Sequence, residues 1–317
     1  MGTFRRIMLS GGLDIDLDID VDSLPEEQKI YYTAPFKVKP STDSLGVVLV
    51  NKWNSSTKEG VIACENTIKK IGDKAFSGCG SLISMNIPDS VTSIGIEAFR
   101  GCVSLESIYI PDSVTSIGNN AFDGCNQLTN VYISDISTLC NISLGNPRSN
   151  PLYYESNLYL NNELVTDLVI PDSVTKIENA AFYNCKSIIS VTIPDGVTSI
   201  GNVVFRGCKN LASITIGNTV TSIGDYAFTH CSSLTSVTIP DNVRKIGMEA
   251  FYECSSLTSV YCKPTTPPAL GNSYVFDYNH SDRKFYVPAG SLNAYKRATN
   301  WSKYASAIVG YDFENGV

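Results

Sequence analysis

Apolar and polar residues alternate over short stretches of this chain, and the stretches recur. In 236–241, "SVTIPD", Val237 and Ile239 alternate with hydroxyl residues, which is the period of two expected of a strand with one buried face. Proline fixes φ and aspartate bonds to nearby backbone, so Pro240 and Asp241 predict a turn. Closely similar phrases begin at Ile110, Ile170 and Ile193.

The rest of the phrase predicts a second strand and a short helical turn. Ile246 and Gly247 close a second extended piece, and Ala250, Phe251 and Cys254 have the i, i+1, i+4 spacing of one helical face. A unit this small cannot bury all of these apolar residues alone. We therefore expect coils that stack at the strand spacing of about 4.8 Å, so that each residue type forms a row along the stack.

The phenylalanine of the phrase gives the period. It stands at Phe76, Phe99, Phe122, Phe182, Phe205, Phe228 and Phe251. The steps are 23 residues, except for one of 60 residues that holds an irregular unit of 37. Periods of about 20–29 residues are typical of leucine-rich repeats.

Seven of the ten cysteines occupy one slot of the same phrase. These are Cys79, Cys102, Cys125, Cys185, Cys208, Cys231 and Cys254. A repeated slot indicates a packing position, because a free thiol behaves as a small buried hydrophobe. We expect these seven thiols to be reduced and buried, and the C-x₂-C spacing typical of zinc sites is absent from the sequence.

The pattern "LxxVxIPxxVxxIxxxAFxxCxx" over about residues 60–264 resembles the repeat of the BspA-like, or Treponema pallidum type, surface proteins. The resemblance implies a right-handed leucine-rich-repeat solenoid, α/β but mostly β, with a parallel concave sheet, short convex strands and helical turns. It also implies a bacterial protein at the cell surface or secreted, which takes part in adhesion to host proteins or other cells and has no conserved active site.

The chain divides into four predicted parts. They are an acidic N-terminal extension at 1–23, an N-terminal β cap at 24–60, the solenoid at 61–264 with its irregular unit at 133–169, and a C-terminal strand–helix cap at 265–317. Predicted strands of the N-terminal cap are "KIYYTA", "FKVKP", "GVVLVNKW" and "EGVIAC". In the C-terminal cap we expect a strand at "RKFYVP" and one helix over "AGSLNAYKRATNWSKYASAIVG", with Leu292, Tyr295, Trp301 and Tyr304 over the open end of the core.

The irregular unit predicts two elements. "SDISTLC" indicates a short helix capped by Ser134 or Asp135, and "NLYLNNELV" indicates a hairpin over Asn161 and Asn162. One interpretation is an oversized coil that keeps the stack in register. The other is a projecting element whose Tyr153, Tyr154 and Tyr159 contact a ligand.

The acidic extension contains "LDIDLDIDVD", whose period of two predicts a strand with one acidic face. An EF-hand register places Asp16, Asp18, Asp20 and Glu27 at ligand positions, but Val21 stands where the loop needs glycine. A solvated strand whose like charges discourage aggregation is therefore favoured over a calcium site, and we expect no metal or cofactor.

Charge and composition exclude several classes of function. The net charge of −7 argues against nucleic acid or anionic membranes as partners, and no run of 18 apolar residues predicts a membrane span. The apolar stretch after Arg5 and Arg6 is too short for a secretory signal peptide, so the surface location rests on the resemblance alone. With His230 and His280 as the only histidines, and no nucleophile or nucleotide motif, we expect no enzyme.

The candidate binding site lies on the outward positions of the predicted long strands, which carry Ser, Thr, Asn and Tyr. Binding hot spots contain tyrosine more often than serine or threonine, so the first candidates are Tyr109 and Tyr132 on adjacent coils. Ser107, Asn130 and Tyr261 are candidates beside them. Tyr153, Tyr154 and Tyr159 of the irregular unit are second.

Two functions fit this pattern. The first is a binding or adhesion module that recognises a host or bacterial surface protein or a glycan through the concave face and the irregular unit. The alternative is a structural appendage component, virion or prophage-encoded, without a soluble ligand. The absent signal-peptide pattern and the acidic extension favour the alternative, and the polar, tyrosine-bearing strands together with the resemblance favour the first.

Overall fold

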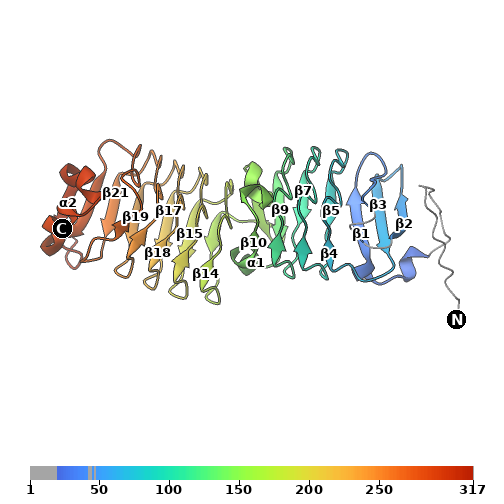
Figure 1. The fold of residues 1–317 in the computed structure, drawn as a ribbon, viewed down its shortest axis with the longest axis horizontal. Helices are drawn as coiled ribbons and strands as arrows, with labels where there is room; N and C mark the ends of the chain where they lie inside the picture. Colours follow the sequence, from blue (N-terminus) through green and yellow to red (C-terminus); the bar gives the residue numbers. More distant parts are fainter. Residues whose placement is uncertain (1–19, 42–44, 46–47, 317) are drawn as a thin grey trace.

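The computed structural model describes residues 20–41, 45 and 48–316. It is an elongated rod of stacked coils, with an antiparallel sheet near the N-terminal end and short helices at the C-terminal end (Figure 1). This arrangement confirms the predicted leucine-rich-repeat solenoid.

Each coil begins with a longer strand. These strands are β5 (Ser84–Asn86), β7 (Ser107–Tyr109), β9 (Asn130–Ile133), β11 (Asn157–Leu160), β13 (Asp167–Val169), β15 (Ser190–Ile193), β17 (Ser213–Ile216), β19 (Ser236–Ile239) and β21 (Ser259–Cys262). Within a sheet, equivalent residues of successive coils are paired in parallel, as Val191 is with Ile214. We call the outward side of these strands the strand face.

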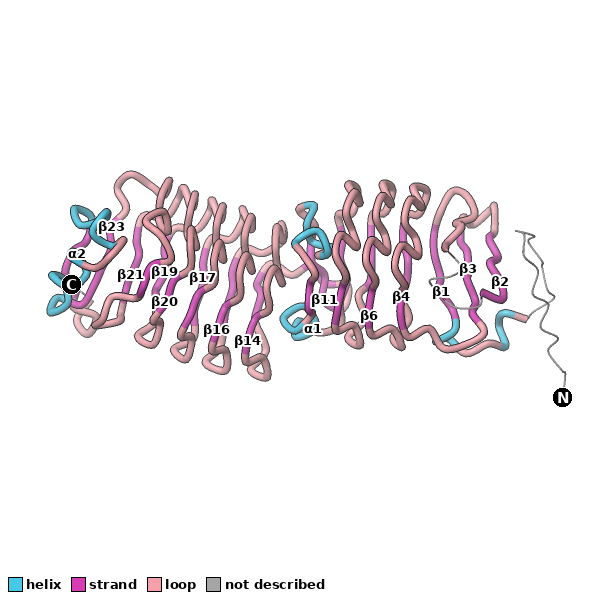
Figure 2. Tube along the Cα trace, in the orientation of Figure 1, coloured by secondary structure: helices cyan, strands magenta, loops and turns pink. Residues whose placement is uncertain are grey.

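A shorter strand follows each of the long strands except β11, and one more, β4, precedes β5 (Figure 2). These are β4 (Lys70–Ile71), β6 (Ser93–Ile94), β8 (Ser116–Ile117), β10 (Ser143–Leu144), β14 (Lys176–Ile177), β16 (Ser199–Ile200), β18 (Ser222–Ile223), β20 (Lys245–Ile246) and β22 (Ala269–Leu270). They form two parallel sheets, β10-β8-β6-β4 and β14-β16-β18-β20-β22. The predicted second extended piece is thus present in the described coils apart from that of β11, which is followed by a hairpin strand instead.

The predicted helical turn around the Ala-Phe pair is wrong. In the coil of Phe228, the N–H groups of Tyr226, Phe228 and His230 donate to carbonyls of the next coil at 2.7–2.9 Å, so they are not available for helix bonds. Tyr226 and His230 have φ of 58° and 64°, which a right-handed helix excludes. The segment is therefore a chain of turns, and we call this side of the coils the turn edge.

The phenylalanines form a ladder through the core. Neighbouring rings lie nearly parallel with centroids 5.0–5.5 Å apart, in one run from Phe76 to Phe122 and another from Phe182 onward. The second run has a member that the period did not predict, because Phe276 stacks on Phe251 at 5.4 Å. Repeat packing therefore continues beyond residue 264.

The seven cysteines of the repeat, which we call the ladder cysteines, are buried with one exception. The prediction that all seven are buried is therefore wrong for Cys79. The thiols of Cys102, Cys125, Cys208, Cys231 and Cys254 each donate to the carbonyl of the preceding coil's phenylalanine at 3.1–3.2 Å. Cys79 belongs to the first coil of the run and has no such partner. Its Sγ lies 3.7 Å from the Lys39 carbonyl, and the side chain is half-buried.

We expect thiol labelling of the native protein to modify Cys79 first. Burial raises the pKa of the Cys254 thiol to about 12, so the reactive thiolate is scarce and shielded there. Burial also raises the pKa of Cys79, to about 11, but its partial exposure gives the reagent access. Mass spectrometry after brief alkylation checks this. Disulfides among the ladder cysteines, or early labelling of Cys254, would contradict the packing account.

The irregular unit contains both predicted elements. Helix α1 (Ile136–Asn141) is capped by Asp135, whose Oδ1 accepts from the Ser137 N–H at 2.8 Å, and the helix leads through β10 and the turns η4 (Pro147–Ser149) and η5 (Pro151–Tyr154) to β11. β11 pairs in parallel with β9, so this coil keeps the register.

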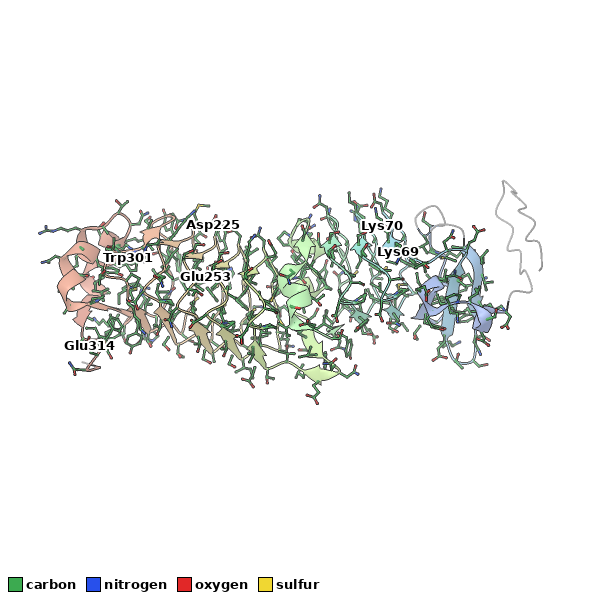
Figure 3. The ribbon with its side chains drawn as sticks, turned by 90° about the horizontal axis from the view of Figure 1, so that it is seen from below. Lys69, Lys70, Asp225, Glu253, Trp301 and Glu314 are labelled. Carbon is green, nitrogen blue, oxygen red and sulfur yellow. The ribbon has the colours of Figure 1, made fainter. Side chains whose placement is uncertain are left out.

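A hairpin then ends the first half of the rod. β12 (Glu163–Leu164) folds back antiparallel on β11, with Asn161 and Asn162 at φ of 51° and 68° in the predicted turn. The yellow-green hairpin stands out from the rod in Figure 3. β13 starts a separate sheet, so the unit interrupts the stack as well as extending it.

The predicted single C-terminal helix is wrong. The segment forms η6 (Ala289–Ser291), α2 (Leu292–Arg297) and η7 (Trp301–Ala307), and then β24 (Ile308–Tyr311), which pairs in parallel with β23 (Lys284–Pro288). Helix α2 ends because Ala298 is extended and Asn300 has φ of 66°.

The four predicted capping side chains nevertheless close the core. Tyr295, Trp301 and Tyr304 are buried, and Leu292 is half-buried against the core. Tyr295 and Trp301 donate to the carbonyls of Pro264 and Pro268 at 2.8 Å, which satisfies their polar atoms. Trp301 is labelled at the C-terminal end in Figure 3.

At the N-terminal end, β1 (Lys29–Thr33), β2 (Val48–Trp53) and β3 (Glu59–Cys64) form an antiparallel sheet that joins the first coil through β1 and β5. The predicted strand "FKVKP" at 36–40 is wrong, since this stretch is irregular although Val38 is buried.

The predicted acidic strand lies mostly outside the described residues, as do Asp16 and Asp18 of the rejected calcium register. Its described end differs from the prediction, because Val21 lies in the turn η1 (Val21–Ser23), followed by η2 (Glu26–Gln28). The cause is local, since the Asp20 side chain accepts from the Asp22 N–H and starts the turn.

Candidate functional site

The strand face is polar and nearly uncharged. Its outward residues are Ser84, Asn86, Ser107, Tyr109, Asn130, Tyr132, Asn157, Tyr159, Asp167, Val169, Ser190, Thr192, Ser213, Thr215, Ser236, Thr238, Ser259 and Tyr261, and all are exposed or half-exposed. The one charged member, Asp167, accepts a hydrogen bond from the Ser190 hydroxyl at 2.5 Å. This surface therefore offers hydrogen bonds and ring edges instead of charge.

A tyrosine group forms where the strand face meets the hairpin. Tyr132 and Tyr159 are register partners on β9 and β11, and their rings stack with centroids 4.8 Å apart. Tyr109 faces Tyr132 in register, but its hydroxyl lies 3.0 Å from the Ser134 hydroxyl, which donates to Asp112 at 2.7 Å. The ring partner of Tyr132 is thus Tyr159 of the irregular unit, while Tyr109 is held by a hydrogen-bond network.

The hairpin adds two residues that the sequence analysis missed. Leu164 is paired with Tyr159 across the hairpin, so it lies on the same face, and it is 48% exposed. Asn157 continues the polar row of Ser107 and Asn130. The similarity between "NVYI" at 130–133 and "NLYL" at 157–160 could have shown that the second segment is another strand of the same sheet. We call Tyr109, Tyr132, Tyr159 and Leu164, with the row Ser107, Asn130 and Asn157, the tyrosine platform.

Tyr153 and Tyr154 do not join this platform. They lie in η5 near the turn edge, where Tyr153 stacks on Tyr183 at 5.4 Å. The Tyr154 hydroxyl accepts from the Gly124 N–H at 2.6 Å, and burial raises the pKa of its phenol. Of the three insert tyrosines, only Tyr159 is therefore brought to the strand face.

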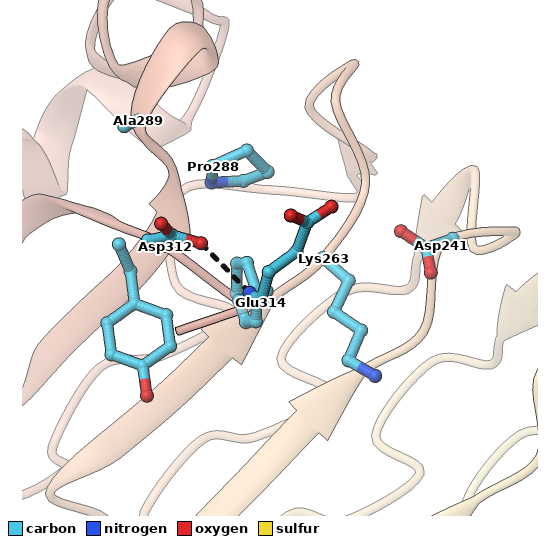
Figure 4. Close-up of a pocket in the computed structure, with 8 residues that line it drawn as sticks. Asp241, Lys263, Pro288, Ala289, Asp312 and Glu314 are labelled. Carbon is cyan, nitrogen blue, oxygen red and sulfur yellow. Dashed lines mark hydrogen bonds between the residues drawn. The ribbon is translucent and has the colours of Figure 1, made fainter. Parts of the chain in front are cut away.

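Tyr261 belongs to a second aromatic group at the C-terminal end. Its ring stacks on Tyr286 at 4.7 Å, and Tyr311 meets both rings edge-on. Beside them is a pocket of about 450 Å³ with Lys263 and the carboxylates of Asp241, Asp312 and Glu314 (Figure 4). Five strands of the second half, β13 to β21, carry no other tyrosine outward, so Tyr261 is separate from the tyrosine platform.

In the part of the chain that the structure describes, no three His, Cys, Asp or Glu side chains are grouped closely enough to hold a metal ion. Within the same residues, every helix is too short or too polar to cross a lipid bilayer.

The family model for the BspA type leucine rich repeat region matches six copies over residues 53–146 and 153–281. Similar solved structures include a leucine rich cell surface protein of Faecalibacterium prausnitzii, with 21% identity, 79% of this chain and 89% of that chain covered, and a TM-score of 0.40. A leucine-rich repeat protein of T. pallidum is 29% identical, with 54% and 73% covered and a TM-score of 0.36. One from Bacteroides ovatus is 22% identical, with 86% and 75% covered and a TM-score of 0.42. The search of curated proteins found no match.

Proposed function

This chain belongs to the BspA-type leucine-rich-repeat family, and from that premise we propose that it is a non-enzymatic binding or adhesion module at the bacterial surface. Its ligand is a surface protein or a glycan, bound at the tyrosine platform.

The observation that carries the proposal is the stacked pair Tyr132 and Tyr159 beside the hairpin. Because the two rings cover each other's faces, they present hydroxyl-bearing edges outward, which both donate and accept hydrogen bonds. Leu164 adds apolar area beside Tyr159, and Asn130 adds an amide two residues before Tyr132 on the same strand. Rigid aromatic area next to adaptable polar groups is the composition of efficient recognition surfaces.

The test begins with an array of glycans and host-matrix proteins probed with the intact chain. For a ligand found there, the double change Tyr132→Ser and Tyr159→Ser is expected to weaken binding at least tenfold, about 1.4 kcal/mol. The effect follows from losing both ring edges at the centre of the platform. Surface plasmon resonance measures it.

Tyr153→Ser is the matched control, because it also removes a stacked tyrosine but lies away from the strand face. Thermal melts of both variants show whether folding is intact. Equal affinity of the double variant and the intact chain would contradict the proposal.

A further inference from the structure

A groove of about 410 Å³ follows the turn edge across five coils of the second half, those of Phe182 to Phe276. Its lining includes Tyr183, Arg206, Lys209, His230, Glu253 and Tyr278. Glu253 is labelled in Figure 3. The groove is separate from the tyrosine platform, since all of these residues belong to the turns around the phenylalanine ladder or directly after it.

Arg206 is the unusual group in this groove. Its guanidinium lies over two tyrosine rings, 5.9 Å from the centre of Tyr183 and 6.0 Å from that of Tyr226. Among the described residues its side chain has neither an ion pair nor a hydrogen bond, although a guanidinium carries five N–H donors. The rings hold the cation in place by cation–π attraction and leave its donors free.

The same slot in the first half of the rod shows what has changed. Arg100 also follows its ladder phenylalanine, but its guanidinium nitrogens lie 3.1 Å from Glu97 and 3.6 Å from Asp123. The equivalent positions around Arg206 hold Val203 and Thr229. Arg206 therefore lacks both of the carboxylates that pair with Arg100.

The other charged side chains of the groove already have polar partners. Lys209 lies 2.6 Å from Glu155, and His230 Nδ1 lies 2.8 Å from Glu253. This leaves Arg206 as the charge that a ligand has to satisfy. Arginine binds planar and tetrahedral oxyanions through two parallel N–H bonds, so the complementary group is a carboxylate or a sulfate.

We propose that this groove is a second binding site, which takes an acidic oligosaccharide whose carboxylate or sulfate group pairs with Arg206. The remaining lining suits a sugar chain. Asn184, Ser232 and Ser255 donate to backbone carbonyls, so their side-chain oxygens are oriented and can accept hydrogen bonds from sugar hydroxyls. Tyr278, 70% exposed, supplies a ring. The lining has no aliphatic side chain to hold the apolar residues of a peptide.

The test titrates the intact chain with a galacturonic acid hexamer, a chondroitin sulfate hexasaccharide and a neutral glucan hexamer. We expect at least one acidic hexamer to bind, the neutral one not to bind, and binding to weaken as salt rises. Arg206→Gln is expected to lower the affinity at least tenfold. The choice between the two acidic hexamers separates carboxylate from sulfate recognition.

Arg100→Gln is the matched control, because it removes the same charge from the same slot outside the groove and should leave the affinity unchanged. Thermal melts confirm that both variants fold. Unchanged affinity in Arg206→Gln, no binding of either acidic hexamer, or equal binding of the neutral hexamer would overturn the proposal. Tighter binding of a poly-glutamate peptide than of both acidic hexamers would also overturn it.

Discussion

Phe205→Ala is expected to lower the free energy of unfolding by about 3–5 kcal/mol, the usual cost of truncating a buried phenylalanine. The Phe205 side chain is fully buried, and its ring stacks between those of Phe182 and Phe228 at 5.5 and 5.4 Å. Removing it opens a cavity in the middle of the second run of the ladder. Coils interact mainly with their neighbours, so we expect the loss to be greatest around this coil.

Chemical denaturation of the variant and the parent chain measures this loss. Phe36→Ala is the control, because the Phe36 side chain is 69% exposed and its removal leaves no core cavity. A loss below about 1 kcal/mol for Phe205→Ala, far under the core range, would mean that the ladder does not carry the packing energy.

Gly224→Ala is expected to destabilise the stack by about 1–3 kcal/mol, as overpacking does. A Cβ at Gly224 would collide with the Gly201 backbone of the preceding coil and lie 2.6 Å from the Asn202 nitrogen. These are backbone atoms, so the clash cannot be relieved by rotating a side chain. Gly201 and Gly247 show the same close approach, which explains the glycine after the isoleucine of β16, β18 and β20.

Gly290→Ala is the matched control, since a Cβ there meets nothing within 4 Å. Equilibrium unfolding of the two variants should therefore separate them clearly. If both variants had the stability of the parent chain, the close approach of successive coils would be wrong.

The period, the register and the ladder were predictable because each coil has to fit its neighbours, which forces the same residues to recur. Phe276 was missed because it follows Phe251 by 25 residues instead of 23, and because Asn279 stands three residues after it, where the other ladder rings have a cysteine. The turn edge was mispredicted since i, i+4 spacing does not reveal that alternate N–H groups bond to the next coil.

The sequence also contains a feature that marks the interruption of the stack, and the sequence analysis did not use it. Ile177 is followed by Glu178, where the short strands of the other 23-residue coils are followed by glycine. The N–H of Glu178 donates to the carbonyl of Cys140 in α1 at 2.8 Å, so the element beside it is a helix.

The candidate site was predictable in part. Tyr132 and Tyr109 follow from strand alternation, but the stack of Tyr132 on Tyr159 requires knowing that β11 continues the sheet of β9. The groove around Arg206 could not be predicted, because the two rings under its guanidinium, Tyr183 and Tyr226, come from different coils, and Tyr183 is itself stacked on Tyr153 of the irregular unit.

Differential tyrosine modification tests the central claim most directly, namely that ligands bind at the tyrosine platform. The intact chain is nitrated with and without saturating ligand from the array, and each tyrosine is quantified by mass spectrometry. The account predicts that ligand protects Tyr132 and Tyr159, while Tyr274, 51% exposed at the C-terminal end, is modified to the same extent in both samples. Equal modification of Tyr132 and Tyr159 with and without ligand would contradict it.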